Sequence, residues 1–273
     1  ITLMPRPEIL LTNDDGILSP GLWAAAEALS HIGYVTVAAP KEQSSGAGRS
    51  LPSTSSGLIH EEMVILRGQP WKVYAVSGTP AQAVQHSVME IMPKKPDLVV
   101  SGINYGENVA NGITISGTVG AAMEAASLGI PALAVSLQTD PEHNLSYSTE
   151  IDFSTAAYFT ALFSRMMLDR PLPKGVDLIK LDVPSLATPD TLWEWSQLSQ
   201  ERYYIPVKPE RTSWQEPARI GFKVDMQLDL EPEDSDVYVL RQKRRVSATP
   251  ITLNMTARVD KNTLNHFALQ SGS

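Results

Sequence analysis

Residues 8–22 read Glu-Ile-Leu-Leu-Thr-Asn-Asp-Asp-Gly-Ile-Leu-Ser-Pro-Gly-Leu, and the rest of the chain is organised around this stretch. The apolar run Ile-Leu-Leu predicts a buried strand, and the turn residues at 13–16 end it. Pro20 then opens a helical pattern, because proline suits the first turn, where its missing N–H costs nothing. Two adjacent carboxylates, Asp14 and Asp15, are therefore expected at the C-terminal end of a strand. In open α/β sheets this edge is where ligands bind.

The two adjacent aspartates repel each other. Their charges must be offset by solvent, by a basic side chain or by a hard divalent cation, which takes oxygen ligands. Asn, Asp and Gly are also ordinary turn formers, so residues 13–16 are equally consistent with an Asx-rich turn. This stretch alone leaves both the turn and the metal site open.

The chain has 273 residues, a net charge of −8 and no cysteine. Its length suits one large α/β domain or a domain with a substantial appendage. The acidic balance argues against a nucleic-acid polymer or an anionic membrane as the main partner, although it allows a small phosphorylated ligand. The lack of cysteine excludes disulfides, thiolate metal sites and cysteine nucleophiles. No apolar run approaches a membrane-spanning length and the N-terminal residues lack a signal-peptide layout, so a cytoplasmic protein is expected.

Helix-like and strand-like patterns alternate from residue 8 to residue 183. After the opening strand, the predicted strands are at 34–39, 96–102, 131–137 and 176–183, and the predicted helices are at 21–32, 81–92, from 116 onward and at 148–168. Two further β-like runs, at 58–66 and 71–76, predict an antiparallel excursion. The β-α-β order predicts parallel strands joined by right-handed crossovers, and hence an α/β fold.

Two further polar loops follow predicted strands, so they are expected at the same sheet edge as the Asp pair. The loop at 41–50 is rich in hydroxyls and glycines and can wrap an anion, although such loops are more often plain connectors. The loop at 103–108 is rich in side-chain oxygens. The helix start at 116–118 is a natural phosphate site through its free N–H groups and its dipole. These segments contribute the candidate ligand-binding residues Ser45, Gly46, Asn104, Asn108, Ser116, Gly117 and Thr118.

The C-terminal part has no clear β-α-β rhythm. Residues 219–228 and 236–246 alternate between apolar and polar side chains around an acidic turn at 231–235, which predicts a long β-hairpin. Such an arm often joins subunits, but it can equally pack on its own domain, because an isolated hairpin is marginal in water. The predicted organisation is an α/β catalytic core at 1–184 and an extension at 185–273, whose hairpin arm at about 219–246 serves oligomerisation.

Five motifs occur in order in the first half of the chain. They are Leu-Leu-Thr-Asn-Asp-Asp-Gly at 10–16, Ala-Pro-Lys-Glu-Gln-Ser-Ser-Gly-Ala at 39–47, Val-Ser-Gly-Thr-Pro-Ala at 76–81, Pro-Asp-Leu-Val-Val-Ser-Gly-Ile-Asn-Tyr-Gly-Glu-Asn at 96–108 and Ser-Gly-Thr-Val-Gly-Ala-Ala-Met-Glu at 116–124. On these motifs the chain resembles the SurE family of metal-dependent nucleotidases. Asp182 departs from the Asn-x-Pro that the family usually has at this point, and residues 185–245 match the family poorly.

The resemblance implies a Rossmann-like α/β fold, with a mostly parallel sheet flanked by helices and a C-terminal β-hairpin extension. It implies that one divalent cation per subunit, Mg²⁺ or Mn²⁺, is held by Asp14, Asp15, Ser45 and Asn104. It also implies hydrolysis of nucleoside monophosphates, as by a 5'/3'-nucleotidase, in a homodimer or homotetramer. The residues expected to bind the substrate are Asn13, Gly46, Asn108, Ser116, Gly117 and Thr118. Asp14 and Asp15 are the catalytic candidates, and their roles as base, nucleophile or plain ligand stay open.

Two other functions compete with this one. A haloacid-dehalogenase-like phosphatase also uses a strand-end aspartate, but its two aspartates are separated by one residue, whereas Asp14 and Asp15 are adjacent. A non-catalytic nucleotide-binding regulatory protein could keep the same site as a sensor. The presence of every expected ligand favours an enzyme over a sensor, and no G-x-G-x-x-G motif for a dinucleotide follows the first strand.

Overall fold

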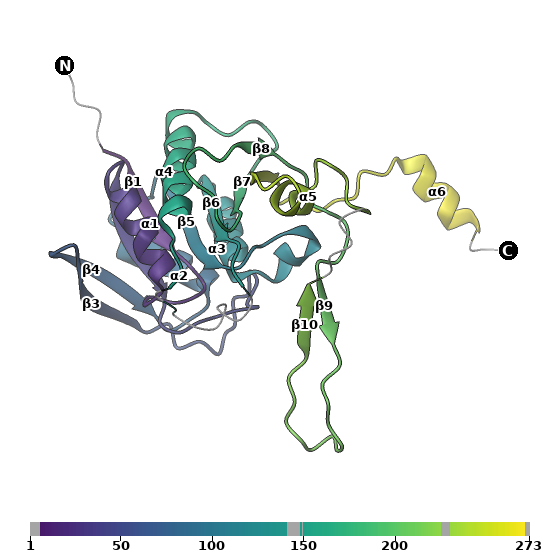
Figure 1. Cartoon of the computed structure of the whole chain (residues 1–273), viewed down its shortest axis with the longest axis horizontal. Coiled ribbons are helices and arrows are strands. Elements are labelled where there is room, and N and C mark those ends of the chain that lie inside the picture. The colour runs from purple at the N-terminus through teal and green to yellow at the C-terminus, as the bar shows by residue number, and fades with distance from the viewer. Residues whose placement is uncertain (1–5, 141–147, 149, 225–229, 271–273) are drawn as a thin grey trace.

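The computed structural model describes residues 6–140, 148, 150–224 and 230–270. Within these residues, one nine-stranded sheet has the order β3-β4-β2-β1-β5-β6-β7-β11-β8 (Figure 1). Its strands are β1 (Glu8–Thr12), β2 (Tyr34–Pro40), β3 (Ile59–Leu66), β4 (Gln69–Val76), β5 (Leu98–Tyr105), β6 (Ala132–Leu137), β7 (Leu178–Val183), β8 (Trp193–Trp195) and β11 (Val246–Ile251). Neighbouring strands from β4 to β7 run parallel, while β3 is antiparallel to β4 and β11 to β7. The predicted mostly parallel α/β sheet is confirmed.

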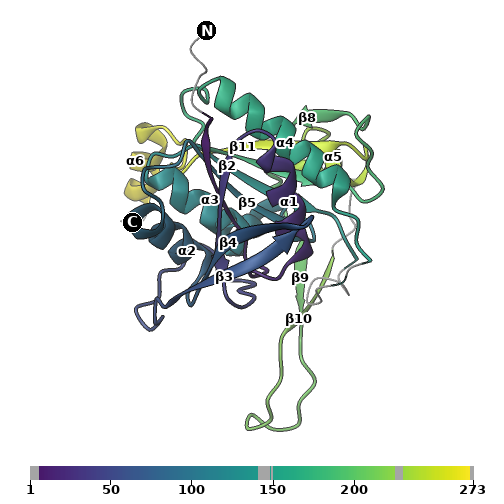
Figure 2. The ribbon, with the colours of Figure 1, turned by 90° about the vertical axis from the view of Figure 1, so that its left-hand side faces the viewer.

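Helices cover both faces of this sheet (Figure 2). Helices α1 (Pro20–Ser30) and α4 (Ser154–Asp169) share one hydrophobic core with it, and α2 (Pro80–His86) and α3 (Gly117–Ser127) share the other. Local capping follows the sequence, since Pro20 is the first residue of α1 and the Thr79 hydroxyl accepts the N–H of Gln82 at the start of α2. In the described part of the chain, no helix combines the length and the apolar character that crossing a bilayer requires.

The sheet order places a topological switch point at its centre. Strand β1 lies between β2 and β5, so the chain leaves β1 toward one side of the sheet and later continues on the other side. The C-terminal ends of β1 and β5 are therefore the place where a ligand crevice forms in this class of fold. Asp14 and Asp15 follow β1, and Asn104 lies in the last residues of β5. Asn104 is thus on a strand and not in the predicted loop.

Two predicted helices differ from the structure in their bounds. The helix predicted at 81–92 is α2 followed by a π-helical turn at Ser87–Ile91. The helix predicted at 148–168 begins later, at Ser154, whose backbone N–H donates to the carboxylate of Asp152 at 2.8 Å. That contact ends the preceding irregular segment, which the helical spacing of the sequence did not distinguish from the helix.

The predicted pairing of 219–228 with 236–246 is wrong. Residues at the start of the second run form helix α5 (Asp236–Arg241), which begins where the Ser235 hydroxyl accepts the N–H of Tyr238 at 3.1 Å. The apolar residues of α5 fit a helical spacing as well as an alternating one. All of them are covered by the chain's own domain, and they are Val237, Val239 and Leu240.

An antiparallel hairpin does project from the domain, and one of its strands lies within the predicted run 219–228, but its partner strand comes earlier in the chain. It pairs β9 (Tyr204–Val207) with β10 (Gly221–Val224) (Figure 1). Met226 and Leu228, expected on the arm, lie outside the described residues. Strand β11 returns to the main sheet between β7 and β8, and helix α6 (Lys261–Gln270) then lies apart from the body (Figure 1). The C-terminal part therefore completes the sheet in addition to extending from it.

Candidate active site

A pocket of about 660 Å³ opens at the switch point. It is lined by the ends of β1 and β5, the loop after β2, the start of α3 and the β9–β10 hairpin. Its chemically informative lining residues are Asp14, Asp15, Ser45, Gly46, Asn104, Glu107, Asn108, Ser116, Arg202, Tyr204 and Phe222. Most of the residues predicted from the sequence therefore share one pocket. Asn13, Gly117 and Thr118 stand behind it.

The two aspartates at the base of the pocket are almost completely buried, with 5% of Asp14 and 3% of Asp15 exposed. Burial raises the pKa of Asp14 above its ordinary value, although hydrogen bonds from Thr118 and from the backbone of Gly117 act in the opposite direction. Burial also raises the pKa of Asp15, to about 8, and the charge of Asp14 adds to this effect. A bound divalent cation would lower the pKa of both carboxyl groups, because its positive charge favours their ionised forms.

The start of α3 holds Asp14 in place. The Thr118 hydroxyl donates to the Asp14 carboxylate. A Cβ on Gly117 would lie 2.7 Å from the Cβ of Asp14 and 2.8 Å from its Oδ2, so this close approach requires glycine. Gly117 and Thr118 thus contact the carboxylate directly, and their expected role toward a substrate phosphate stays a prediction.

The donor set of the pocket fits a hard cation. No three His, Cys, Asp or Glu side chains gather into a metal-binding group among the described residues, so the carboxylates need neutral partners. Ser45 offers a hydroxyl. Asn104 donates its amide N–H groups to the carbonyls of Tyr105 at 3.0 Å and Gly106 at 2.7 Å, so its Oδ1 is the atom left to face a ligand. Two carboxylates, a hydroxyl and an amide oxygen suit Mg²⁺ or Mn²⁺, with water in the remaining positions.

Asn13 shapes the turn and does not line the pocket. Its Nδ2 donates to the carbonyl of Gly16 at 3.0 Å, and its Oδ1 accepts the N–H of Gly16 at 3.1 Å. Gly16 has a φ of 97°, which favours glycine at this position. The Asx-rich turn and the carboxylate site are therefore both present, because the turn is what presents Asp14 and Asp15 to the pocket.

A known protein family matches most of this chain. The family model described as survival protein SurE matches residues 9–204, which is more than half of the chain. The chain belongs to the SurE family. A protein named 5'-nucleotidase SurE from Thermococcus gammatolerans is 42% identical over 97% of this chain and 98% of its own. A protein of the same name from Methanosarcina mazei is 37% identical over 96% of this chain and 97% of its own. The crystal structure of the SurE protein from Aquifex aeolicus has a TM-score of 0.74 and 29% identity, and the match covers 96% of this chain and 100% of that one.

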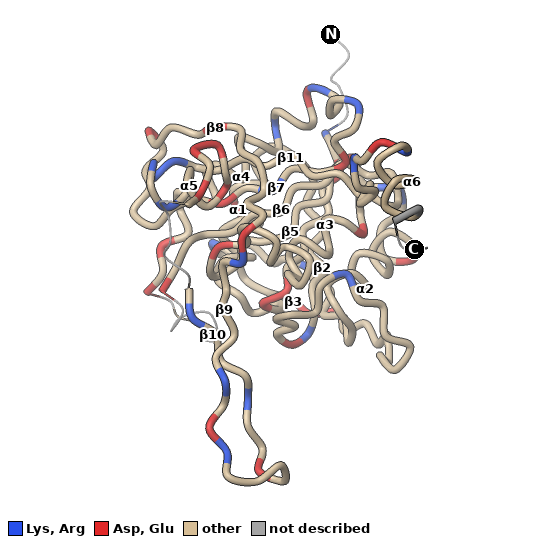
Figure 3. The backbone as a smooth tube through the Cα atoms, turned by 90° about the vertical axis from the view of Figure 1, so that its right-hand side faces the viewer, with Lys and Arg blue, Asp and Glu red and all other residues tan. Residues whose placement is uncertain are grey.

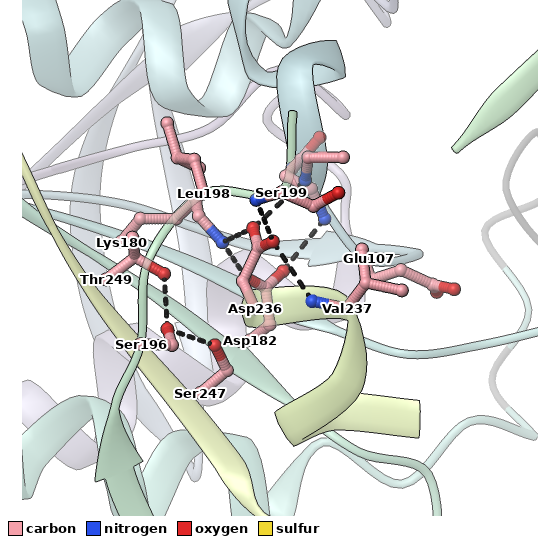
Figure 4. Close-up of polar contacts among 12 residues, drawn as sticks. Glu107, Lys180, Asp182, Ser196, Leu198, Ser199, Asp236, Val237, Ser247 and Thr249 are labelled. Carbon is pink, nitrogen blue, oxygen red and sulfur yellow. Dashed lines mark hydrogen bonds and ion pairs between the residues drawn. The ribbon is translucent and has the colours of Figure 1, made fainter. Parts of the chain in front are cut away.

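In this SurE-family chain, buried charges support the pocket loop from behind (Figure 4). Lys180 is fully buried between two carboxylates, Asp182 and Asp236, and lies 3.1 Å from the latter. Asp182 accepts the N–H of Asn108 at 2.8 Å, and Asp236 accepts the N–H of Ala110 at 3.0 Å. The residue that departs from the usual family motif therefore fixes the backbone of a pocket residue. Burial raises the pKa of Asp182 to about 6, although the Lys180 charge opposes this.

Glu107, which also lines the pocket, connects this SurE-type core to the C-terminal part. Its carboxylate accepts hydrogen bonds from the hydroxyl of Tyr203 and the guanidinium of Arg241. Its carbonyl accepts the hydroxyl of Tyr204 at 2.9 Å. The first strand of the hairpin is thereby tied to the loop that follows β5.

Sequence reasoning missed the pocket residues in and beside the hairpin, namely Arg202, Tyr204 and Phe222. Arg202 and Tyr204 lie at the very end of the residues that the family model matches, and Phe222 lies beyond them. A local signal was present in the aromatic residues of this segment, Tyr-Tyr at 203–204, Trp214 and Phe222. Such a cluster does not reveal which surface it faces, because that depends on pairing between distant segments.

Proposed function

We propose that the chain is a divalent-metal-dependent phosphatase that hydrolyses nucleoside monophosphates to nucleoside and phosphate. The observation that carries the proposal is the buried pair Asp14 and Asp15 at the base of a pocket whose other donors are neutral oxygens. The names of the relatives, 5'-nucleotidase SurE, support the nucleotide as substrate. The two competing functions are not favoured, since the aspartates are adjacent and the chain belongs to a family with nucleotidase relatives.

In this proposal Asp14, Asp15, Ser45 and Asn104 hold one Mg²⁺ or Mn²⁺ ion. When bound, the ion would neutralise phosphoryl charge and act as a Lewis acid. The α3 N-terminus orients Asp14, and the turn at 13–16 fixes the direction of both carboxylates.

Phosphate recognition would fall to neutral donors at the pocket wall. Asn108 donates from Nδ2 to the Ser136 hydroxyl at 2.8 Å, and its amide has a second N–H to offer a phosphate oxygen. Gly46 has no atom within 4 Å of the place where a Cβ would lie, so a ligand can approach its backbone closely. Ser116, which caps α3, completes this wall.

Phosphate release from AMP tests the proposal, measured with and without excess EDTA. We expect Asp14→Asn or Asp15→Asn to lower kcat by roughly 10²–10³-fold, a loss typical of a removed electrostatic contact in an active site. The matched control is Asp190→Asn, because Asp190 is exposed. A panel in which no nucleotide is hydrolysed, while another phosphoester is, would show that the substrate is wrong.

We also propose that the partner is a small phosphate monoester, that the protein is cytoplasmic and that it forms a homodimer or homotetramer. Basic and acidic residues are interspersed along the described backbone (Figure 3), which supports a small substrate over a polyanion. Helix α6 stands apart from the body (Figure 1), and a helix this short is marginal in water without a packing surface. Light scattering of the full chain tests the assembly, and a monomer at micromolar concentration would contradict it.

A further inference from the structure

The active-site pocket has two chemically different walls. The carboxylates and amides from β1, β5 and α3 form one wall, and it is polar. The other wall comes from the β9–β10 hairpin and presents the side chains of Tyr204, Pro206, Ile220 and Phe222. A phosphate ester that reaches Asp14 and Asp15 would have its organic group within the same pocket, whose volume of about 660 Å³ suits a small-molecule ligand.

The two aromatic rings of this wall are in an edge-to-face arrangement. The Tyr204 and Phe222 ring centroids are 5.3 Å apart and the ring planes meet at 83°. Tyr204 is fixed at its other end, where its hydroxyl donates to the carbonyl of Glu107 at 2.9 Å, and its ring also contacts Tyr203 with centroids 4.8 Å apart. Phe222 as a whole residue is 54% exposed. A large apolar ring is thus held at the pocket edge with half of its surface open.

We infer that Tyr204 and Phe222 form the subsite for the base of the nucleoside monophosphate, with the base stacked on the open surface of Phe222. This inference rests on the proposed nucleotidase function and adds to it a part of the site that no motif of the sequence supplies. Stacking of a base on an aromatic side chain changes affinity by roughly 5- to 150-fold. Because every base has a π-face, this subsite favours nucleotides over simple phosphate esters and discriminates little among the bases.

The test compares two substrates that differ in the base alone, AMP and ribose 5-phosphate. We expect Phe222→Ala to lower kcat/KM for AMP by about 5-fold or more, mainly through KM, because stacking on a remote part of the substrate is uniform binding. The value for ribose 5-phosphate is expected to stay within about 2-fold. Phe222→Tyr, which keeps the ring, is expected to retain the AMP value.

Trp214→Ala is the matched control, because Trp214 is an aromatic residue of the same hairpin that is 87% exposed and outside the pocket lining. We expect this variant to leave kcat/KM unchanged for both substrates. Equal losses on AMP and ribose 5-phosphate in Phe222→Ala would overturn the inference, since they would show that the ring only supports the fold. Unchanged AMP kinetics would overturn it too. Failure of the unaltered protein to hydrolyse either substrate would instead refute the proposed function, and the base subsite with it.

Discussion

Replacing Asp182 by Asn is expected to change how stability depends on pH. In the structure, one lysine, Lys180, faces two carboxylates, Asp182 and Asp236, in a fully buried cluster. The cluster therefore holds one more acid than base. An Asn at position 182 keeps an oxygen that accepts the N–H of Asn108 and removes the excess carboxyl group.

The sign follows from the pKa of Asp182, which burial raises from 3.8 to about 6 in the folded protein. Between these two pH values the folded state binds more protons than the unfolded state, so the free energy of unfolding falls as pH rises toward about 6. The stabilisation by the protonated carboxyl group is therefore present at lower pH and is lost above about pH 6. A single carboxyl group with these pKa values adds about 1.4 kcal/mol of stability at pH 5 and almost none at pH 7. The Asp182→Asn variant lacks this pH-dependent stabilisation.

Urea unfolding of both proteins at pH 5 and pH 7 measures the effect. The measured quantity is the unfolding free energy of the unaltered protein minus that of Asp182→Asn. We expect this difference to be about 1.4 kcal/mol larger at pH 5 than at pH 7. Groups outside this cluster titrate alike in both proteins, so their contributions cancel. Asp190→Asn, at an exposed position, is expected to shift nothing. A difference that stays constant with pH would mean that Asp182 is ionised throughout, and the reasoning would be refuted.

Two further predictions concern the same supports. Lys180→Met is expected to destabilise the protein by about 3–5 kcal/mol in urea unfolding, because it leaves two buried carboxylates without their cation, and Asp182→Asn in the same chain is expected to restore part of the loss; a cost under about 1 kcal/mol would contradict this. Gly117→Ala is expected to reduce phosphate release by at least about 10-fold, because the new Cβ, 2.7 Å from the Cβ of Asp14, must displace that carboxylate. Unchanged turnover in Gly117→Ala would refute the close contact between this position and Asp14.

The polar edge of the sheet could be predicted because its signals are local. The strand Glu8–Thr12 is an apolar run that stops at turn residues, and Pro20 marks the next helix within a few positions. The C-terminal ends of parallel strands lie at the same edge of a sheet. It was therefore enough to know that Asp14 and Asn104 each come at the end of a predicted parallel strand.

The hairpin and the buried charges could not be predicted because they depend on distant pairs. Strands β9 and β10 have four residues each, and a long connection separates them, so no turn signal links them. The apolar residues of the run that starts at Asp236 fit both the helical and the strand period. The N-cap at Ser235 and the burial of these residues against the domain stabilise the helix. Lys180 and Asp182 point the same way on β7 by strand alternation, but Asp236 is supplied by a helix much later in the chain.

We propose above all that one divalent cation binds the oxygens of Asp14, Asp15, Ser45 and Asn104. Anomalous scattering from a crystal of the full chain grown with Mn²⁺ tests it most directly. We expect one strong peak in the pocket within about 2.0–2.6 Å of oxygen atoms from all four residues, the range for hard cations. Its absence in Asp14→Asn crystals grown in the same way would be the matched control. A peak elsewhere with none beside Asp14 and Asp15, or no peak at saturating Mn²⁺, would contradict the account.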